Sequence, residues 1–258
     1  MRGANLVEVF SSIQGEGTHV GTTTLFVRFG ACDLRCRWCD SPQTWEPASQ
    51  CRIEIGRCSG EFETRPNPVS VDDVIAAAES LDLAAHEFAS LTGGEPLLQP
   101  EAVGEIARAM RARGPRILLE THGLASEALE SVLADIDVVS MDWKLSSDVR
   151  RASDPRRGSV EPFHTEHEKF LTIARQAPEL IVKLVITRAS LDDEIDEAVS
   201  RLEASAPEAT LILQPVTPFG PVQESPSAER LLALCARLSS RLPKVRVIPQ
   251  THKIYGAP

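Results

Sequence analysis

Short runs of apolar and β-branched residues alternate along the chain with segments whose apolar residues recur at helical spacing. The runs predict strands at Thr24–Phe29, His86–Thr92, Arg116–Thr121, Asp137–Met141, Leu180–Ile186, Thr210–Gln214 and Val245–Ile248. The helical spacing predicts helices at Val71–Leu81, Glu101–Arg113, Ala125–Leu133, Thr165–Gln176, Leu191–Leu202 and Ala228–Leu238. Ser70 has the side chain and the position of an N-cap for the first helix.

The repeated order of strand and then helix predicts an α/β fold, in which a parallel sheet is covered by helices. Six or seven β/α units fall short of the eight that close a barrel, so we expect a partial, open β/α barrel. An open doubly wound sheet is the structural alternative. We expect one domain over residues 1–258, with an irregular insertion at about 46–68, where the pattern loses its periodicity.

Composition narrows the classes of protein that fit this pattern. Hydrophobic residues make up 42% and charged residues 25%, as in ordered globular proteins. The formal net charge of −10, without a run of Lys and Arg, argues against nucleic acid as a partner. The apolar runs are too short to cross a bilayer, and the N-terminus lacks the apolar segment of a signal peptide. We therefore expect a cytoplasmic protein that acts on a small molecule, away from membranes.

Cysteines give the first indication of chemistry. Cys32, Cys36 and Cys39 stand at CxxxCxxC spacing directly after a predicted strand. Iron–sulfur clusters are usually held by four thiolates, so three would leave one iron of a [4Fe–4S] cluster open to a cosubstrate. A structural zinc site, with Cys51 or Cys58 or a histidine as fourth ligand, is the alternative. Buried cysteines without a metal are the third possibility.

A pair of glycines follows the next predicted strand, in the segment Leu91-Thr92-Gly93-Gly94-Glu95-Pro96. Paired glycines let a backbone approach a ligand closely. Together with the cysteine triplet, this segment resembles the radical S-adenosylmethionine (SAM) superfamily. The resemblance implies that the open iron chelates SAM and that the glycines bind its amino group.

Further motifs narrow the resemblance to one family. They are the segments Phe10–Gly17 (FSSIQGEG), Cys39–Trp45 (CDSPQTW), Leu119–Gly123, Ser140–Lys144 and Val245–Lys253. This ordered set resembles the 7-carboxy-7-deazaguanine synthases over nearly the whole chain. Activating enzymes of glycyl-radical systems share the cysteine triplet without the N-terminal segment, and they are one alternative. A non-catalytic zinc-binding scaffold is the other.

The resemblance implies a carbon–nitrogen lyase of queuosine and 7-deazapurine biosynthesis. Its substrate would be 6-carboxy-5,6,7,8-tetrahydropterin and its product 7-carboxy-7-deazaguanine, with loss of ammonia. It implies a [4Fe–4S] cluster, SAM and Mg²⁺ as cofactors. It also implies an external one-electron reductant of the flavodoxin or ferredoxin kind, and a homodimer.

The resemblance also implies roles for individual residues. The predicted SAM contacts are Gly93, Gly94, Ser140, Lys144 and Gln214. The predicted substrate contacts are Gln14, Glu16, Arg28, Thr92, His252 and Pro258. Ser41 is the predicted Mg²⁺ ligand, with Asp40 as the competing oxygen donor. The chemistry is compatible, since Glu16 can accept two hydrogen bonds from a pterin edge and Arg28 can pair with a carboxylate. No acid or base for the loss of ammonia is assigned.

Overall fold

The computed structural model describes residues 3–155 and 158–256. The predicted substrate contact at Pro258 lies outside these ranges. Within them, the main sheet has ten strands in the order β14-β13-β12-β10-β9-β8-β3-β2-β5-β6. Seven neighbouring strands run parallel, namely β3 (Thr23–Phe29), β8 (Phe88–Gly93), β9 (Arg116–Thr121), β10 (Val138–Asp142), β12 (Glu179–Ile186), β13 (Thr210–Pro215) and β14 (Val245–Val247).

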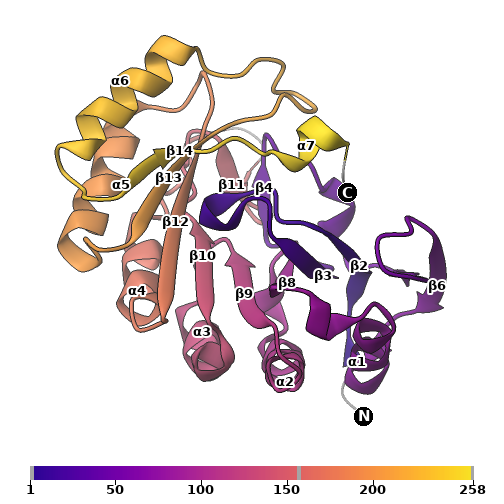
Figure 1. Ribbon diagram of the computed structural model, residues 1–258. Helices are drawn as coiled ribbons and strands as arrows, with labels where there is room; N and C mark the ends of the chain where they lie inside the picture. The colour runs from indigo at the N-terminus through magenta and orange to yellow at the C-terminus, as the bar shows by residue number, and fades with distance from the viewer. Residues whose placement is uncertain (1–2, 156–157, 257–258) are drawn as a thin grey trace.

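Helices connect these parallel strands and cover the outer side of the curved sheet (Figure 1). They are α1 (Val71–Ser80), α2 (Pro100–Arg111), α3 (Ser126–Val132), α4 (His164–Ala174), α5 (Asp192–Ser205) and α6 (Ala228–Ser239). The seven strands follow one another in chain order without a reversal. Right-handed connections then place every helix on the same side, whereas a doubly wound sheet needs a reversal. The sheet ends at β14 and β6 without closing, which confirms the predicted open barrel.

Three strands of the main sheet, β2, β5 and β6, were not predicted. β2 (Leu6–Ile13) lies antiparallel to β3 in the interior of the sheet, and most of its residues are buried whether polar or apolar, so it lacks a clear alternation. β5 (Gln50–Glu54) and β6 (Phe62–Pro66) form a hairpin at the edge, so the prediction of an irregular segment at 46–68 was wrong. The polar and charged residues of β6 are mostly exposed, as suits an edge strand, and they hide its pattern.

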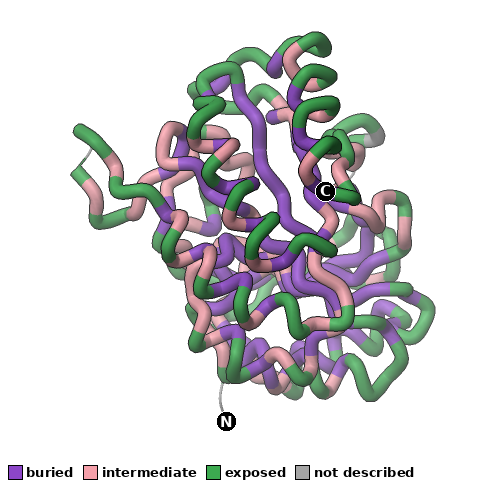
Figure 2. The backbone as a smooth tube through the Cα atoms, turned by 90° about the vertical axis from the view of Figure 1, so that its left-hand side faces the viewer, coloured by how far each residue is buried: buried purple, intermediate pink, exposed green. Residues whose placement is uncertain are grey.

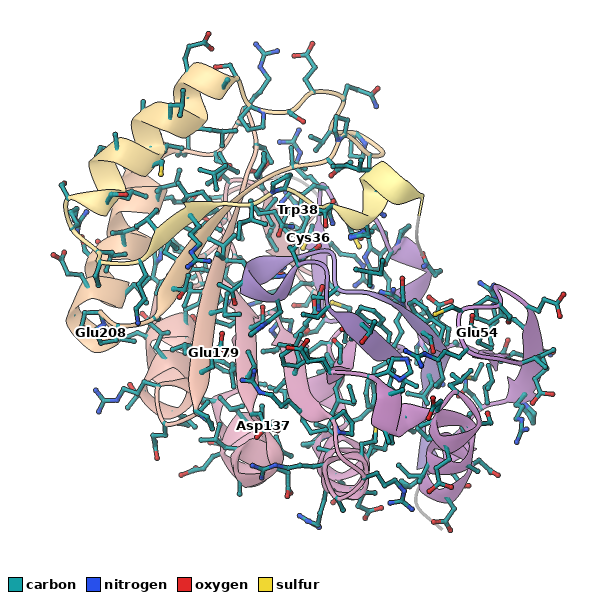
Figure 3. The ribbon with its side chains drawn as sticks, in the orientation of Figure 1. Cys36, Trp38, Glu54, Asp137, Glu179 and Glu208 are labelled. Atoms are coloured by element: carbon teal, nitrogen blue, oxygen red, sulfur yellow. The ribbon has the colours of Figure 1, made fainter. Side chains whose placement is uncertain are left out.

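The carboxylate of Glu54 fastens this hairpin to the body of the sheet. It is buried and accepts hydrogen bonds from the backbone N–H groups of Ser11, at 2.8 Å, and Gly60, at 3.0 Å. Figure 3 labels Glu54, which ends β5 next to the turn of the hairpin. The segment is therefore an extension of the sheet with its own anchoring contact.

Two apolar layers hold the barrel together. The larger lies between the sheet and the helices and includes the buried residues of all six connecting helices. Figure 2 shows the outcome, with buried strands inside and helices exposed on their outer edges. The smaller layer lies inside the barrel and takes one residue from each of five successive parallel strands: Phe88, Leu118, Val138, Ile181 and Ile212.

The loop between β2 and β3 completes this inner layer. Its 3-10 turn, Gly17–His19, contacts β12, and the ring of His19 lies 4.5 Å from that of Phe88. His19 Nε2 also lies 2.9 Å from a carboxylate oxygen of Glu179, at the start of β12. The loop thereby fills the amino-terminal end of the barrel and leaves the carboxyl ends of the strands open. In the described ranges, no helix combines the length and apolar character that crossing a membrane requires.

The predicted N-cap of α1 is confirmed, because Ser70 Oγ accepts a hydrogen bond from the N–H of Asp73 at 3.1 Å. We expect Ser70→Ala to lower the free energy of unfolding by about 1 kcal/mol, since one helix N–H loses its partner. Ser131→Ala, on the exposed face of α3, is the control, because alanine favours a helix interior. Chemical denaturation measures both changes, and equal stability of the two variants would contradict the assignment.

Candidate active site

A cavity opens at the carboxyl ends of the parallel strands, with an empty volume of about 1320 Å³ including its open mouth. Figure 3 places Cys36 and Trp38 at this end of the barrel and Asp137 and Glu179 at the other. Most of the predicted site residues line the cavity, namely Gln14, Glu16, Arg28, Cys32, Cys36, Cys39, Ser41, Thr92, Gly93, Gly94, Lys144, Gln214 and His252.

Ser140 is an exception to this convergence. It is buried in β10, two residues after Val138 of the inner layer, and it is not among the residues that line the cavity. Successive side chains of a strand alternate between its faces, so Val138, Ser140 and Asp142 share the inner face. Asp142, at the end of β10, lines the cavity instead. Ser140 therefore lies one step deeper in the barrel than the sequence led us to expect.

The loop that carries Cys32, Cys36 and Cys39 (the cysteine loop) is held in shape by hydrogen bonds to its own backbone. Cys36 ends the short strand β4 (Leu34–Cys36), which pairs with β11 (Val149–Arg151). The N–H of Cys39 donates to the carbonyl of Cys36, at 3.2 Å, and the guanidinium of Arg35 donates to the carbonyl of Cys32, at 2.7 Å. The three thiols are free and only partly buried. The loop therefore presents them to the cavity from a fixed frame.

The glycine pair fits closely against this loop. A Cβ on Gly94 would lie 2.1 Å from the carbonyl oxygen of Ala31, and one on Gly93 would lie 2.3 Å from that of Phe29. Gly93 also has a φ of +128°, which side chains rarely allow. The sequence suggested a close approach to a ligand. The structure shows that the glycines also allow the end of β8 to approach the cysteine loop.

Glu95 connects three parts of the site. Its side chain is 0% exposed and accepts hydrogen bonds from Thr121 Oγ1 and from the N–H of His122, both at 2.8 Å. His122 Nε2 in turn lies 2.8 Å from a carboxylate oxygen of Asp33, in the cysteine loop. The ends of β8 and β9 and the cysteine loop are thus joined by one chain of polar contacts, which is buried as far as His122 and ends at the exposed Asp33.

The cysteine set suits a cluster better than a single ion. Burial raises the pKa of the Cys32 thiol to about 11 and that of Cys36 to about 12, so both thiols stay protonated until a metal takes their protons' place. Among the described residues, no three His, Cys, Asp or Glu side chains are grouped around one ion position. A [4Fe–4S] cluster needs no such grouping, because each thiolate binds a different iron.

The other cysteines lie away from the three thiols. Cys51 is buried in β5 among core residues, Cys58 is exposed in the turn of the hairpin, and Cys235 is partly buried on α6. Cys235 thus packs as a small apolar side chain. The residues present therefore fit a cluster with three protein ligands.

Two buried lysines, Lys144 and Lys183, also line the cavity, together with the carboxylates of Asp142, Glu16 and Glu120. Lys144 Nζ lies 2.9 Å from Asp142 Oδ2 and 4.6 Å from the centre of the Trp38 ring. Burial opposes ionisation of Asp142, but the two lysines, Lys144 and Lys183, outweigh it and lower its pKa to about 2. Lys144 is therefore a buried, paired cation beside the cysteine loop. Its predicted contact with SAM remains a prediction.

Three of the predicted substrate residues, Gln14, Glu16 and Arg28, are held by side-chain contacts. Glu16 Oε2 lies 2.5 Å from Lys183 Nζ, and Glu16 Oε1 accepts a hydrogen bond of 2.7 Å from Gln250. Arg28 Nε donates to Glu8 at 2.8 Å. Gln14 Nε2 donates to Glu120 at 3.2 Å. These contacts join the QGEG loop (residues 14–17) to β9, to β12 and to the C-terminal segment that follows β14.

The C-terminal segment packs on the QGEG loop. The N–H of Thr251 donates to the carbonyl of Gly15 at 2.9 Å, immediately before α7 (His252–Tyr255). A Cβ on Gly15 would lie 2.0 Å from His252 Nδ1, so only glycine leaves room for this histidine. His252 lines the cavity, as predicted.

The side-chain oxygens of Asp40 and Ser41, the two candidate Mg²⁺ ligands, are already hydrogen-bonded. Ser41 Oγ donates to Asp40 Oδ1 at 3.1 Å. Asp40 Oδ2 lies 3.1 Å from Lys253 Nζ and 3.2 Å from Gln250 Nε2. The carboxylate of Asp40 thus joins the cysteine loop to the C-terminal segment. The hydroxyl of Ser41 has fewer partners and is the more available oxygen for a metal ion.

Sequence reasoning missed Lys183, Glu120, Asp142 and Gln250. A charged residue within or at the end of a buried apolar strand is uncommon unless it is paired. Lys183 in Glu179–Ile186 (ELIVKLVI) and Glu120 after Ile117-Leu118-Leu119 carry that signal. Gln250 carries none, since an amide in a loop is ordinary.

Comparison with known proteins identifies the family. Residues 26–203 match the family model described as the radical SAM superfamily. The chain is 36% identical to 7-carboxy-7-deazaguanine synthase from Geobacter sulfurreducens over 259 residues, which cover 98% of each chain. It is 35% identical to the enzyme of that name from Methanopyrus kandleri, over 98% of this chain and 93% of the relative. The chain belongs to the 7-carboxy-7-deazaguanine synthase family.

Solved structures share the fold at lower identity. The crystal structure of QueE from Escherichia coli matches with a TM-score of 0.61 and 20% identity, covering 97% of this chain and 95% of that one. A radical SAM methyltransferase from Sphaerobacter thermophilus matches with a TM-score of 0.58 and 17% identity, covering 88% and 66%. The fold is therefore that of radical SAM proteins.

Membership of this family decides between the alternatives that the sequence left open. The protein is a radical SAM lyase of queuosine biosynthesis, with a [4Fe–4S] cluster and SAM as its cofactors. It is neither a zinc scaffold nor an activating enzyme of a glycyl-radical system. The individual residue roles in the cavity remain predictions.

We expect Cys36→Ala to lose the cluster iron and the reductive cleavage of SAM together, because one iron loses its thiolate. Cys51→Ala and Cys58→Ala are the controls, since these cysteines lie in the core and in an exposed turn. Iron analysis and visible absorption of anaerobically prepared protein measure the cluster. Loss of iron in either control variant would contradict the assignment of three ligands.

Proposed function

We propose that the protein converts 6-carboxy-5,6,7,8-tetrahydropterin to 7-carboxy-7-deazaguanine with loss of ammonia. The observation that carries this proposal is that one cavity is lined both by the three cysteines and by Glu16, Arg28 and His252. Family membership supplies the reaction, and the cavity supplies a place for both ligands.

The residues around the cysteine loop suit SAM. When bound, the cluster and SAM supply a 5′-deoxyadenosyl radical. Gly93 and Gly94 bring a backbone without side chains to the cavity, which suits the SAM amino group. The side chain of Gln214 is buried, and among the described residues its Oε1 has no hydrogen-bond partner. A buried acceptor without a donor is costly, so a donor group of SAM at this position would satisfy it.

Glu16, Arg28 and His252 suit a pterin that carries a carboxylate. Glu16 accepts hydrogen bonds from donors on the pyrimidine edge, and Arg28 pairs with the carboxylate. Thr92 stands beside Arg28 on the neighbouring strand, where its hydroxyl can bond the same ligand. His252 contributes from the C-terminal segment.

The proposed Mg²⁺ site is next to the cysteine loop. Mg²⁺ prefers oxygen and often takes one or two ligands from the protein, with the rest from substrate and water. Ser41 lines the cavity two residues after Cys39, and Asp40 is committed to Lys253 and Gln250. We therefore assign the hydroxyl of Ser41 as the protein ligand.

Three broader features complete the proposal. The reaction needs an external one-electron reductant, for which a flavodoxin or ferredoxin is the proposed donor. A homodimer is proposed from the family resemblance, and the mass in solution tests it. A cytoplasmic location is proposed because reduced thiols persist there.

Anaerobic turnover tests the proposed function. The reconstituted protein is mixed with SAM, a low-potential reductant and 6-carboxy-5,6,7,8-tetrahydropterin, and the products are separated by mass. We expect 7-carboxy-7-deazaguanine to form only when all three are present. SAM cleavage without this product would contradict the proposed substrate and leave the radical chemistry intact.

We expect Ser41→Ala to raise the Mg²⁺ concentration for half-maximal turnover by about tenfold, which corresponds to about 1.4 kcal/mol for one lost ligand. Ser41→Thr is the matched control, since it keeps the hydroxyl. The iron content of both variants should equal that of the unaltered protein. An unchanged Mg²⁺ titration of Ser41→Ala would contradict the assignment.

We expect His252→Ala, and a form that lacks Ala257 and Pro258, to bind the substrate about tenfold more weakly, because each loses a hydrogen bond to it. A C-terminal extension should do the same by obstructing the approach of the C-terminal segment to the substrate. An N-terminal extension of equal length is the control. Equal affinity of all forms in anaerobic equilibrium binding would show that the C-terminus takes no part in recognition.

A further inference from the structure

Lys183 lies at the centre of a buried group of carboxylates. Its side chain is 5% exposed, and its Nζ lies 2.5 Å from Glu16, 3.2 Å from Asp142 and 3.9 Å from Glu120. These carboxylates come from the QGEG loop, from the end of β10 and from β9. The family motifs quoted above leave Lys183 without a role.

The charges explain why this lysine is tolerated. Burial opposes the charge on Lys183, but the carboxylates of Asp142, Glu16 and Glu120 outweigh it and raise its pKa well above the usual value. The cavity thus holds a protonated amine that cannot act as a nucleophile. In the opposite direction, burial raises the pKa of Glu120, and Lys183 limits that rise.

The loop that carries Glu16 needs such an anchor. Glu16 stands between Gly15 and Gly17, and Gly17 has a φ of +68°, so the backbone itself allows several conformations. The two carboxylate oxygens have separate partners. Lys183 holds Oε2 from β12, whereas Gln250 bonds Oε1 from the C-terminal segment. A ligand that displaces Gln250 would therefore meet a carboxylate still fixed at its other oxygen.

We infer that Lys183 is the positioning residue that fixes the carboxylate of Glu16 for hydrogen bonds to the substrate. The inference rests on the proposed function, because Glu16 is the proposed substrate acceptor. Lys144 does not substitute for Lys183, since it is paired with Asp142 beside Trp38. Without Lys183, three carboxylates would face one another with one lysine nearby, and the group would take up a proton.

Lys183→Met tests the inference, since methionine keeps the apolar length and removes the charge. We expect substrate binding to weaken roughly 10- to 100-fold at neutral pH, as for loss of a charge-assisted hydrogen bond. Binding should recover as the pH rises, because the carboxylate group then loses its extra proton. The neighbouring charged and titratable groups Lys144, His252, Arg28, Asp40 and Lys253 are left in place by the variant. Lys169→Met, on the exposed face of α4, is the control.

The iron content should stay unchanged, since the predicted ligands of the cluster are the three cysteines and not Lys183 or Glu16. If Lys183→Met fails to fold, Lys183→Arg keeps the charge but changes the geometry. It should then bind the substrate more weakly without a new pH dependence. Unaltered affinity in the folded variant at every pH would overturn the inference. Failure of the unaltered protein to turn over the pterin would instead overturn the proposed function.

Discussion

The wholly buried carboxylate of Glu95 is the contact on which the arrangement of the site depends. It takes donors from the end of β9 and from its own turn after β8, and through His122 it reaches Asp33 in the cysteine loop. A buried carboxylate is stable only when it is fully hydrogen-bonded, so these partners must remain in place together. The relative position of two barrel strands and the thiols follows from that requirement.

Close packing adds to this polar contact. Gly93 and Gly94 let the end of β8 lie against Phe29 and Ala31, where a Cβ would meet backbone oxygen. The N–H groups of Gly94 and Glu95 donate to the carbonyls of these two residues, at 3.0 and 2.9 Å. The GGEP segment is thus a structural connection, in addition to its predicted role as a ligand contact.

The sequence predicted the parallel strands and helices because each shows a plain pattern, apolar in the strands and amphipathic in the helices. It failed at β2, where Glu8, Ser11 and Ser12 are buried in the middle of the sheet, and at the charged edge strand β6. Motif residues of the site were found because they stand in short segments that resemble those of a known family. Lys183 and Gln250 were not, because their importance arises from strands and segments that meet only in the folded chain.

The cysteine loop and the predicted substrate residues are held by different kinds of interaction. Backbone hydrogen bonds, glycine contacts and the buried carboxylate of Glu95 fix the cysteine loop, and these cannot rearrange without unfolding it. Side-chain ion pairs and amides hold the QGEG loop and the C-terminal segment, through Lys183, Gln250 and Lys253. Such contacts exchange partners at small cost when a ligand offers equivalent donors and acceptors. Changes on ligand binding should therefore concentrate on the QGEG loop and the C-terminal segment, while the frame around the thiols stays constant.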